Sequence, residues 1–529
     1  MSGTVVEEPM TDAVPEEPAF RGPDISKLQD HTPAAIRSPR VLAGLVFAVG
    51  IIYLIFCMRP LWHTDIWGHL AYGRVICEGK SLPATEPLMP LATGVAFVDT
   101  AWLSQVIGYL TMQNVGIAGL QGLYALANAL CVALLAARTY GKTRSGWFSL
   151  AAMLGFLAVA AESLSIIRPQ VAGIACFVML LFRLTSPRLH RSDWILIPFL
   201  FALWANLHGS FLTGLFLLGS VVAGRAIDVG FRTGSLHAIV RDHRLRRSFL
   251  LLELAVVAVL VNPYGIGVYG AALQIASNPN LNDLTEWHPQ ALRETTGVLF
   301  GAAIVALAIV YRLTPRRVRA WEVITLVVLG WSTFNSSRMI VWWAPVAALL
   351  LALHGHASWR RFRHLPLIPE APVRAGKWTV VAVGLIWIFF AYSPLGIRVI
   401  HGKSPKLERS VSGSTPLAAA KYLREKPPVG QVFNTFEWGD YLQWAGPAGM
   451  KIFVNSHAHL VPREVWQAYM QISDLQSGWE EAIDRYGINT IVIDREHREP
   501  LIKKLKEIDK WKLDFEQDGQ VIFIRKKPI

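Results

Sequence analysis

Ionisable side chains gather in one polar stretch of this chain, residues 61–103, which follows the first long apolar run. The stretch contains Asp65 and Asp99, and His63 and His69 stand on either side of Asp65. A carboxylate near a helix end can accept a proton from an attacking hydroxyl or bind a divalent cation. Both aspartates are therefore candidate catalytic acids, although each would also fit the N-cap of a following helix. Asp65, His63 and His69 are the candidate ligands of Mg²⁺ or Mn²⁺, a metal that no spacing in the chain requires.

Five further polar residues lie outside this stretch, next to the ends of other apolar runs. Arg168 and Arg338 are candidate phosphate ligands, because a guanidinium can bond two phosphate oxygens at once. The alternative for each is a snorkelling side chain that fixes the depth of a helix. Glu286, in the segment LTEWHPQ, is a third candidate catalytic acid. Asn206 and His208 occupy a very short turn, and we expect them to help bind the phosphate.

The elements that must position these residues are apolar runs of nearly membrane-spanning length. The chain has 529 residues, of which 53% are hydrophobic and 17% charged, whereas soluble proteins average about 25% charged residues. We therefore predict a polytopic α-helical membrane protein with about eleven transmembrane helices. The predicted spans are residues 41–58, 116–137, 146–161, 171–184, 194–207, 210–226, 248–262, 297–312, 321–334, 339–354 and 377–394.

The charges between these runs predict the topology. Connections dense in arginine and lysine alternate with connections that are poor in them, and the dense ones are expected in the cytoplasm. Arg37 and Arg40 precede the first run and place the N-terminus inside, so an odd number of spans puts the C-terminus outside. All the candidate residues then fall on the outer side of a bacterial inner membrane. The excess of positive charge, +13 for the whole chain, lies in the predicted cytoplasmic loops. It does not indicate nucleic-acid binding, because no nucleic-acid-binding motif is present.

Three regions are expected along the chain. Residues 1–35 are acidic and rich in proline, which predicts a disordered cytoplasmic tail rather than a signal peptide. Residues 36–396 form the transmembrane domain, with a large first outer loop at 59–115. In residues 397–529 the strand-like segments QVFNTF, KIFVNS, NTIVID and QVIFIR alternate with helical ones. This alternation predicts a soluble extracytoplasmic α/β domain.

An ordered series of motifs resembles a known group of proteins. The series runs through residues 40–529 and comprises TDIWGHLAYGRVI, DTAWLSQVIGYL, IIRPQ, WANLHGSFLTG, NPYG, TEWHPQ, SSRMIVWWAP, FNTFEWGDYLQW, IFVNSHAHL and RYGINTIVID. It resembles the bacterial membrane proteins grouped with the GT-C glycosyltransferases. Members of this group often have a Glu-Trp pair where this chain has Ala101-Trp102. They also often have an arginine where this chain has His457.

The resemblance implies a membrane glycosyltransferase fold and a reaction of cell-envelope synthesis. Such enzymes move a hexosyl or pentosyl group from a polyprenyl-phosphate carrier to an acceptor on the extracytoplasmic face. Their first outer loop carries an essential acid, a role that falls to Asp65, with Asp99 or Glu286 as a second acid. The expected partners are a polyprenyl-phosphate-linked sugar and membrane lipid, and the acceptor is left open.

Two other functions stay open from the sequence. A transporter of lipid-linked glycans would usually carry ionisable residues near the membrane midplane, where the predicted spans have almost none. A non-catalytic assembly protein of envelope biogenesis would use the outer α/β domain to bind a partner. An Asp65→Asn substitution separates these functions from sugar transfer.

Overall fold

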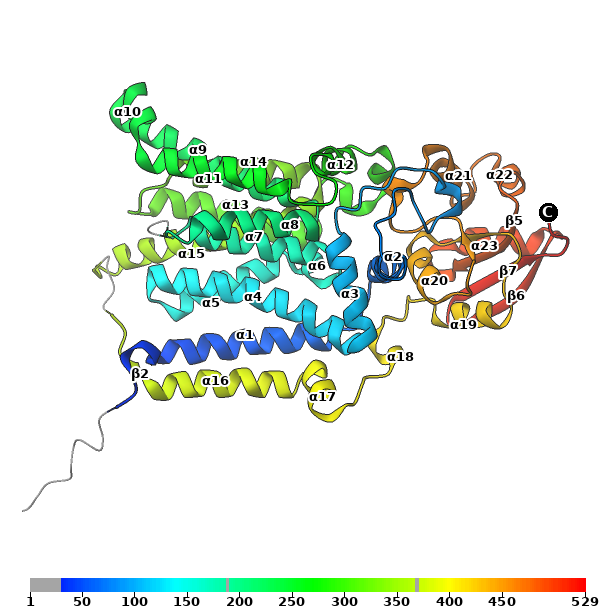
Figure 1. Cartoon of the computed structure of the whole chain (residues 1–529), viewed down its shortest axis with the longest axis horizontal. Helices are drawn as coiled ribbons and strands as arrows, with labels where there is room; N and C mark the ends of the chain where they lie inside the picture. Colours follow the sequence, from blue (N-terminus) through cyan, green and yellow to red (C-terminus); the bar gives the residue numbers. More distant parts are fainter. Residues whose placement is uncertain (1–29, 187–189, 367–370) are drawn as a thin grey trace, which may run out of the picture.

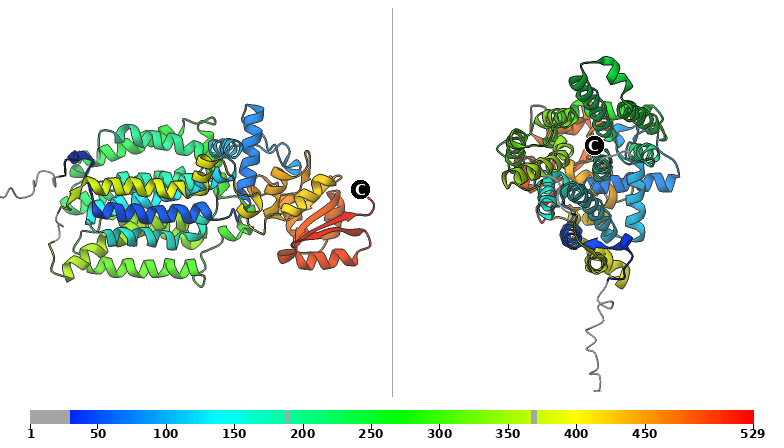
Figure 2. Two further views of the ribbon diagram at one scale, coloured as in Figure 1. Left: turned by 90° about the horizontal axis from the view of Figure 1, so that it is seen from below. Right: turned by 90° about the vertical axis from the view of Figure 1, so that its left-hand side faces the viewer.

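The computed structural model describes residues 30–186, 190–366 and 371–529. Most of the predicted tail at residues 1–35 lies outside the described residues. Figure 1 shows a long molecule, with a bundle of roughly parallel helices at one end and a β-sheet surrounded by short helices at the other. The left view of Figure 2 shows that the C-terminus lies at the sheet end, far from the opposite end of the bundle.

Each of the eleven apolar runs forms a helix of the bundle. Within the described residues, five helices are long and apolar enough to cross a membrane, or six if the pair α16–α17, bent by 82°, is one span. The number of spans stays a prediction, because α5, α7, α8, α11, α14 and α16 have only 14 to 17 residues. The bundle helices are α1 (Arg40–Met58), α4 (Ile117–Thr143), α5 (Gly146–Val159), α7 (Gln170–Leu184), α8 (Asp193–Leu207), α9 (Phe211–Thr233), α11 (His243–Val259), α13 (Thr295–Leu313), α14 (Ala320–Asn335), α15 (Ile340–Phe362) and α16 (Gly376–Ala391).

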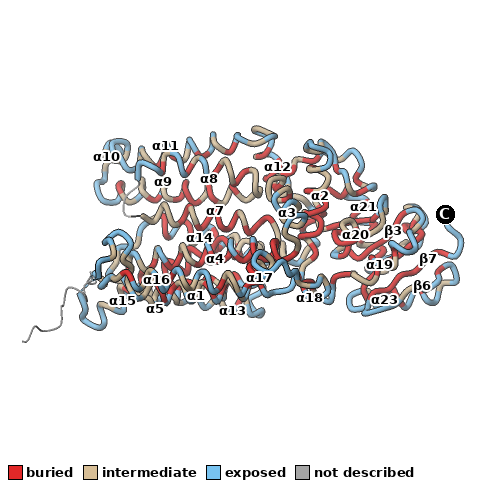
Figure 3. The backbone as a smooth tube through the Cα atoms, turned by 60° about the horizontal axis from the view of Figure 1, so that its bottom comes forward, coloured by how far each residue is buried: buried red, intermediate tan, exposed pale blue. Residues whose placement is uncertain are grey.

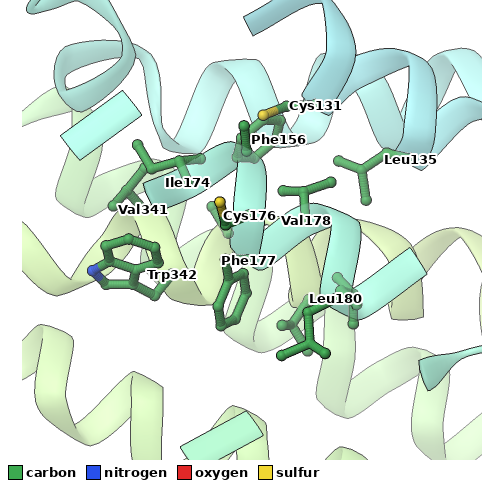
Figure 4. Packing of buried hydrophobic residues seen from close by; sticks show 14 of the residues in the cluster. Cys131, Leu135, Phe156, Ile174, Cys176, Phe177, Val178, Leu180, Val341 and Trp342 are labelled. Atoms are coloured by element: carbon green, nitrogen blue, oxygen red, sulfur yellow. The ribbon is translucent and has the colours of Figure 1, made fainter. Parts of the chain in front are cut away.

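Helix α15 lies at the centre of the bundle and is the most buried of the five long apolar helices of the described chain. Figure 4 shows how Trp342 of α15 packs with Phe177 of α7, near Phe156 of α5 and Leu135 of α4. The peripheral helices expose apolar side chains instead, such as Phe47 of α1, and Figure 3 shows exposed positions along the outer helices of the bundle. A continuous apolar exterior of this kind is typical of a surface that faces lipid rather than water.

Short helices cover the end of the bundle that faces the sheet, here called the sheet-facing end. The predicted first outer loop folds into α2 and α3, which pack against each other. The elements of this end are α2 (Asp65–Gly79), η3 (Pro90–Ala92), α3 (Trp102–Asn114), α6 (Ala161–Ser165), α12 (Gly267–Ala276), η4 (Pro279–Asp283), η5 (Thr285–Trp287), η6 (Ser337–Met339), α17 (Pro394–His401) and α18 (Leu407–Ser410). The opposite end carries η2 (Ala34–Ile36), α10 (Leu236–Arg241) and the antiparallel pair β1 (Ser38–Pro39) and β2 (Arg374–Ala375).

The C-terminal region contains a mixed five-stranded sheet in the order β4-β3-β5-β7-β6. Strand β3 pairs in parallel with β4 and β5, and β7 is antiparallel to β5 and β6. The strands are β3 (Gln431–Asn434), β4 (Lys451–Ile452), β5 (Ile488–Asp494), β6 (Trp511–Gln517) and β7 (Gln520–Arg525). The helices are α19 (Leu417–Glu425), η7 (Phe436–Trp438), α20 (Gly439–Ala445), η8 (Ala458–Leu460), α21 (Arg463–Ser473), α22 (Trp479–Arg485) and α23 (Arg495–Glu507).

The four predicted strands are confirmed, and β6 was not predicted. Its segment WKLDFEQ alternates apolar and charged residues, as a strand at the edge of a sheet can, but the prediction relied on apolar runs rich in β-branched residues, which this segment lacks. Charges on edge strands discourage pairing with other chains.

The sheet also shares its core with the first outer loop. Tyr72 of α2 belongs to the hydrophobic core around Phe433 and Phe453 of the sheet region. Helix α2 therefore packs against the sheet region as well as the bundle.

Candidate active site

Asp65 is the first residue of α2 and lies at the junction of bundle and sheet. Its Oδ1 is 2.8 Å from Nδ1 of His63, and its Oδ2 is 3.5 Å from Nη1 of Arg168. The carboxylate is therefore held by an imidazole and a guanidinium rather than acting as a helix cap. Burial favours the neutral acid, but the interactions with His63 and Arg168 outweigh burial and hold the pKa of Asp65 well below its usual range. Asp65 is thus a negative charge fixed inside the protein.

Arg168, Glu286 and Arg338 form a chain of ion pairs next to Asp65. Glu286 Oε2 lies 2.8 Å from Nη1 of Arg168, and Glu286 Oε1 lies 2.6 Å from Nη1 of Arg338. Ser337 donates from its hydroxyl to the Glu286 carbonyl at 3.0 Å, and the Arg338 guanidinium lies 5.1 Å from the ring centre of Trp287. Four segments far apart in the sequence therefore bring two acids and two guanidinium groups together. Their predicted roles in catalysis and phosphate binding stay predictions.

Buried imidazoles lie on the sheet side of this charge cluster. His69, one helical turn after Asp65, packs edge-on against His457 at a ring distance of 5.0 Å, and His457 lies 5.7 Å from His459. Burial lowers the pKa values of His69 and His459 to about 4, so both are neutral near pH 7. Of the predicted metal ligands, His63 contacts Asp65, whereas the ring of His69 packs against His457. Within the described residues no group of three or more His, Cys, Asp or Glu is placed to hold a metal ion, and the divalent-cation site stays a prediction.

Asn206 and His208 make contacts that explain why a short turn contains them. The Asn206 amide donates to the carbonyls of Ala202 and Val261, and its oxygen accepts from Nε1 of Trp102 at 2.9 Å. These bonds fasten α8 to α3 and favour a structural role for Asn206. His208 Nδ1 lies 2.8 Å from the Ser210 hydroxyl, and burial keeps the pKa of His208 well below its ordinary value. The neutral imidazole can still donate a hydrogen bond to a phosphate.

Asp99 is buried apart from the ion pairs and is held by neutral donors. Its Oδ1 accepts from the backbone N–H of Ala101 at 2.9 Å and from Nε2 of Gln105 at 3.1 Å. No counter-charge offsets the cost of burial among these partners, so burial raises the pKa of Asp99 to about 7. The Gln105 amide also lies 3.4 Å from Nδ1 of His69. Asp99 is therefore linked to α2 through Gln105.

We expect Asp99→Asn to change the pH dependence of stability. The folded protein binds a proton at Asp99 up to about pH 7, whereas the unfolded chain releases it near 3.8. The folded state therefore loses stability as pH rises between these values, by at most about 1.4 kcal/mol per pH unit. An asparagine oxygen keeps both hydrogen bonds and cannot ionise. The melting temperature of the variant, relative to that of the wild type, should rise from about pH 4 to about pH 7 and then level off. A difference that does not change with pH would contradict the buried acid.

One further acid of the site was not among the predicted residues. Asp440 is the second residue of α20 and its side chain is fully buried, packed so closely on Gly68 of α2 that a Cβ there would overlap its carboxylate. Burial and the charge of Asp65 raise the pKa of Asp440 well above its usual range. Asp440 lies in the motif FNTFEWGDYLQW, which carried the family resemblance. It was overlooked because its segment was assigned to a separate soluble domain.

An apolar cavity of about 270 Å³ opens beside the charge cluster. Its walls come from α2, α3, α4 and α7, and they include Leu70, Gly108 and Ala127. Arg168 and His69 provide the polar end of the cavity. The site thus combines an apolar cavity with a guanidinium in its lining and a carboxylate next to that guanidinium.

Comparison with known proteins places this geometry in a recognised fold. No protein-family model matches the chain, and no curated protein matches its sequence. Among solved structures, an oligosaccharyltransferase of Archaeoglobus fulgidus, tethered to an acceptor peptide, matches with a TM-score of 0.52 and 12% identity over 92% of this chain and 74% of its own. ArnT of Cupriavidus metallidurans, bound to undecaprenyl phosphate, matches with a TM-score of 0.50 and 11% identity over 90% of this chain and 97% of its own.

A third match is the arabinofuranosyltransferase AftD from Mycobacteria. It has a TM-score of 0.52 and 14% identity, over 92% of this chain and 40% of its own. The chain therefore has a GT-C-like membrane glycosyltransferase fold, as the motif resemblance implied. At these identities the likeness is one of fold, and the reaction is argued from the site.

Proposed function

We propose that this protein is a GT-C-type glycosyltransferase that moves a sugar from a polyprenyl-phosphate carrier to an acceptor on the extracytoplasmic face of a bacterial inner membrane. The observation that carries the proposal is the presence of Arg168 in the lining of the apolar cavity, with the Asp65 carboxylate 3.5 Å from its guanidinium. A polyprenyl tail requires an apolar groove, and its phosphate requires a cation where that groove reaches the surface.

The site residues take complementary roles in this reaction. Arg168 and Arg338 bind the phosphate, which displaces the Glu286 carboxylate that pairs with both of them in its absence. The acceptor hydroxyl oxygen attacks the anomeric carbon and forms the new glycosidic bond. The bond from that carbon to the phosphate oxygen breaks, and its electron pair stays on the phosphate, where the guanidinium groups stabilise it. The hydroxyl proton passes to the Asp65–His63 pair.

Filling the apolar cavity tests this proposal. Ala127→Trp adds a side chain of about 200 Å² to the cavity wall, and it should weaken the binding of undecaprenyl phosphate at least tenfold. The measurement is native mass spectrometry of the purified full-length protein. Ala151→Trp, at an exposed position of α5, is the matched control and should bind like the wild type. Undiminished binding by a folded Ala127→Trp variant would remove the main support for a polyprenyl donor in this cavity.

A further inference from the structure

A second cavity, of about 380 Å³, lies between the start of the first outer loop and the C-terminal sheet. We call it the polar crevice. Trp62, His63 and Thr64 form one wall of it, and residues that follow β3, β5 and β6 form the other. The polar crevice is distinct from the apolar cavity, because the two share no lining residue.

Asp65 stands between the two cavities. Its neighbour Thr64 lines the polar crevice, and its other neighbour, Ile66, lines the apolar cavity. His63 belongs to the wall of the polar crevice and contacts Oδ1 of Asp65, while Arg168 belongs to the wall of the apolar cavity and contacts Oδ2. A molecule in the polar crevice can therefore contact His63 and a phosphate in the apolar cavity can contact Arg168, and both of these side chains bind the Asp65 carboxylate.

The topology of the sheet independently marks the polar crevice as a binding site. From β3 the chain continues to β4 on one side, whereas β5 lies on the other side of β3 and leads on to β6 and β7. Ligands of open α/β sheets bind where neighbouring parallel strands diverge in this way, outside their carboxyl ends. Thr435, after β3, and Asp494, at the end of β5, both line the polar crevice, and the Thr435 hydroxyl donates to Asp494 Oδ2 at 3.2 Å.

The lining of the polar crevice selects for one class of ligand. It contains four carboxylates, the histidines His63 and His497 and, among the residues described there, no lysine or arginine. The carboxylates belong to Glu437, Asp494, Glu496 and Asp518. Carboxylates accept hydrogen bonds from hydroxyl and ammonium groups and repel anions. Trp62 adds an indole ring that is 43% exposed, a flat apolar surface of the kind that packs against a sugar ring.

We propose that the polar crevice binds the acceptor and that the acceptor is a saccharide without acidic groups, either neutral or bearing amino groups. This inference rests on the proposed function, since it places the attacking hydroxyl at His63 and Asp65. His63 is held by Asp65 through Nδ1, so its Nε2 is the nitrogen that remains for the hydroxyl proton. The carboxylates hold the other hydroxyl or amino groups of the saccharide and fix its orientation.

Binding measurements on the full-length protein in nanodiscs test the inference. The probes are the tetramers of glucosamine, N-acetylglucosamine and galacturonate. Isothermal titration calorimetry measures the binding of each tetramer to the protein. We expect the first two to bind, the glucosamine tetramer more tightly, and the anionic galacturonate tetramer not to bind. Glu437→Gln/Glu496→Gln should weaken glucosamine-tetramer binding about tenfold or more, because it removes two charge-assisted hydrogen bonds. Glu480→Gln/Glu481→Gln changes two exposed acids of α22 outside the polar crevice and should leave binding unchanged.

Two results would overturn the inference. One is binding of the galacturonate tetramer as tight as that of the glucosamine tetramer. The other is that a lysine-containing peptide binds, that its binding depends on Glu437 and Glu496, and that none of the saccharides binds. This result would assign the polar crevice to a polypeptide. Undecaprenyl phosphate binding, measured on the same variants, separates the two proposals. If it persists and stays sensitive to Ala127→Trp while no saccharide binds, only the acceptor assignment fails.

Discussion

Asp65→Asn should lower sugar transfer by roughly 10²- to 10⁴-fold, the usual contribution of a positioned general base. Asparagine has nearly the same shape, so α2 keeps its place between Arg168 and the sheet, but it can neither accept a proton nor carry the charge that faces His63. The assay is transfer from polyprenyl-phosphate-linked sugar in membranes that contain the variant, together with complementation of a deletion strain. Binding of undecaprenyl phosphate should change far less than turnover.

Asp509→Asn is the matched control, because Asp509 is an almost fully exposed acid of the sheet domain, paired only at the surface with Lys526. This control should transfer sugar like the wild type. Full complementation by Asp65→Asn, with the variant folded and present at normal levels, would rule out the transferase mechanism. It would favour a non-catalytic assembly protein that uses the same fold.

Arg168→Ala should weaken binding of undecaprenyl phosphate at least tenfold and also destabilise the protein. The Arg168 side chain is 7% exposed and neutralises both Asp65 and Glu286. Removing one partner of a buried ion pair costs about 3–5 kcal/mol, and the lower end applies here because the Glu286 side chain is one-third exposed. Thermal unfolding and native mass spectrometry measure the two effects on the same sample.

The double variant Arg168→Ala/Glu286→Ala separates structural support from phosphate binding. In the single variant, the Glu286 carboxylate has lost its Arg168 partner. The double variant also removes this carboxylate, so its melting temperature should return a large part of the way to that of the wild type. It should not recover phosphate binding, because the guanidinium is still missing. Recovery of both properties would show that Arg168 only balances the charge of Glu286, and the phosphate would then have to bind elsewhere.

The sequence by itself determined the helices, most of the strands and the polar groups worth considering. The eleven apolar runs became eleven helices, because the length and hydrophobicity of a run are properties of consecutive residues. The alternation of arginine-rich and arginine-poor connections sorted Asp65, Arg168, Glu286 and Arg338 onto one side before any contact was known. Strand β6 was missed because the prediction relied on apolar runs rich in β-branched residues, whereas β6 alternates aromatic and aliphatic residues with charged ones.

Only the tertiary structure decided how these groups combine. It placed Asp440 of the sheet domain against Gly68 of α2, gave Glu286 two arginine partners, and used the amide of Asn206 to join α3 and α8. It also put Asp65 between an apolar cavity and a polar crevice. Such relations join residues at least 52 positions apart in the sequence. They depend on how helices and sheet pack around a shared core, which no local pattern of residues encodes.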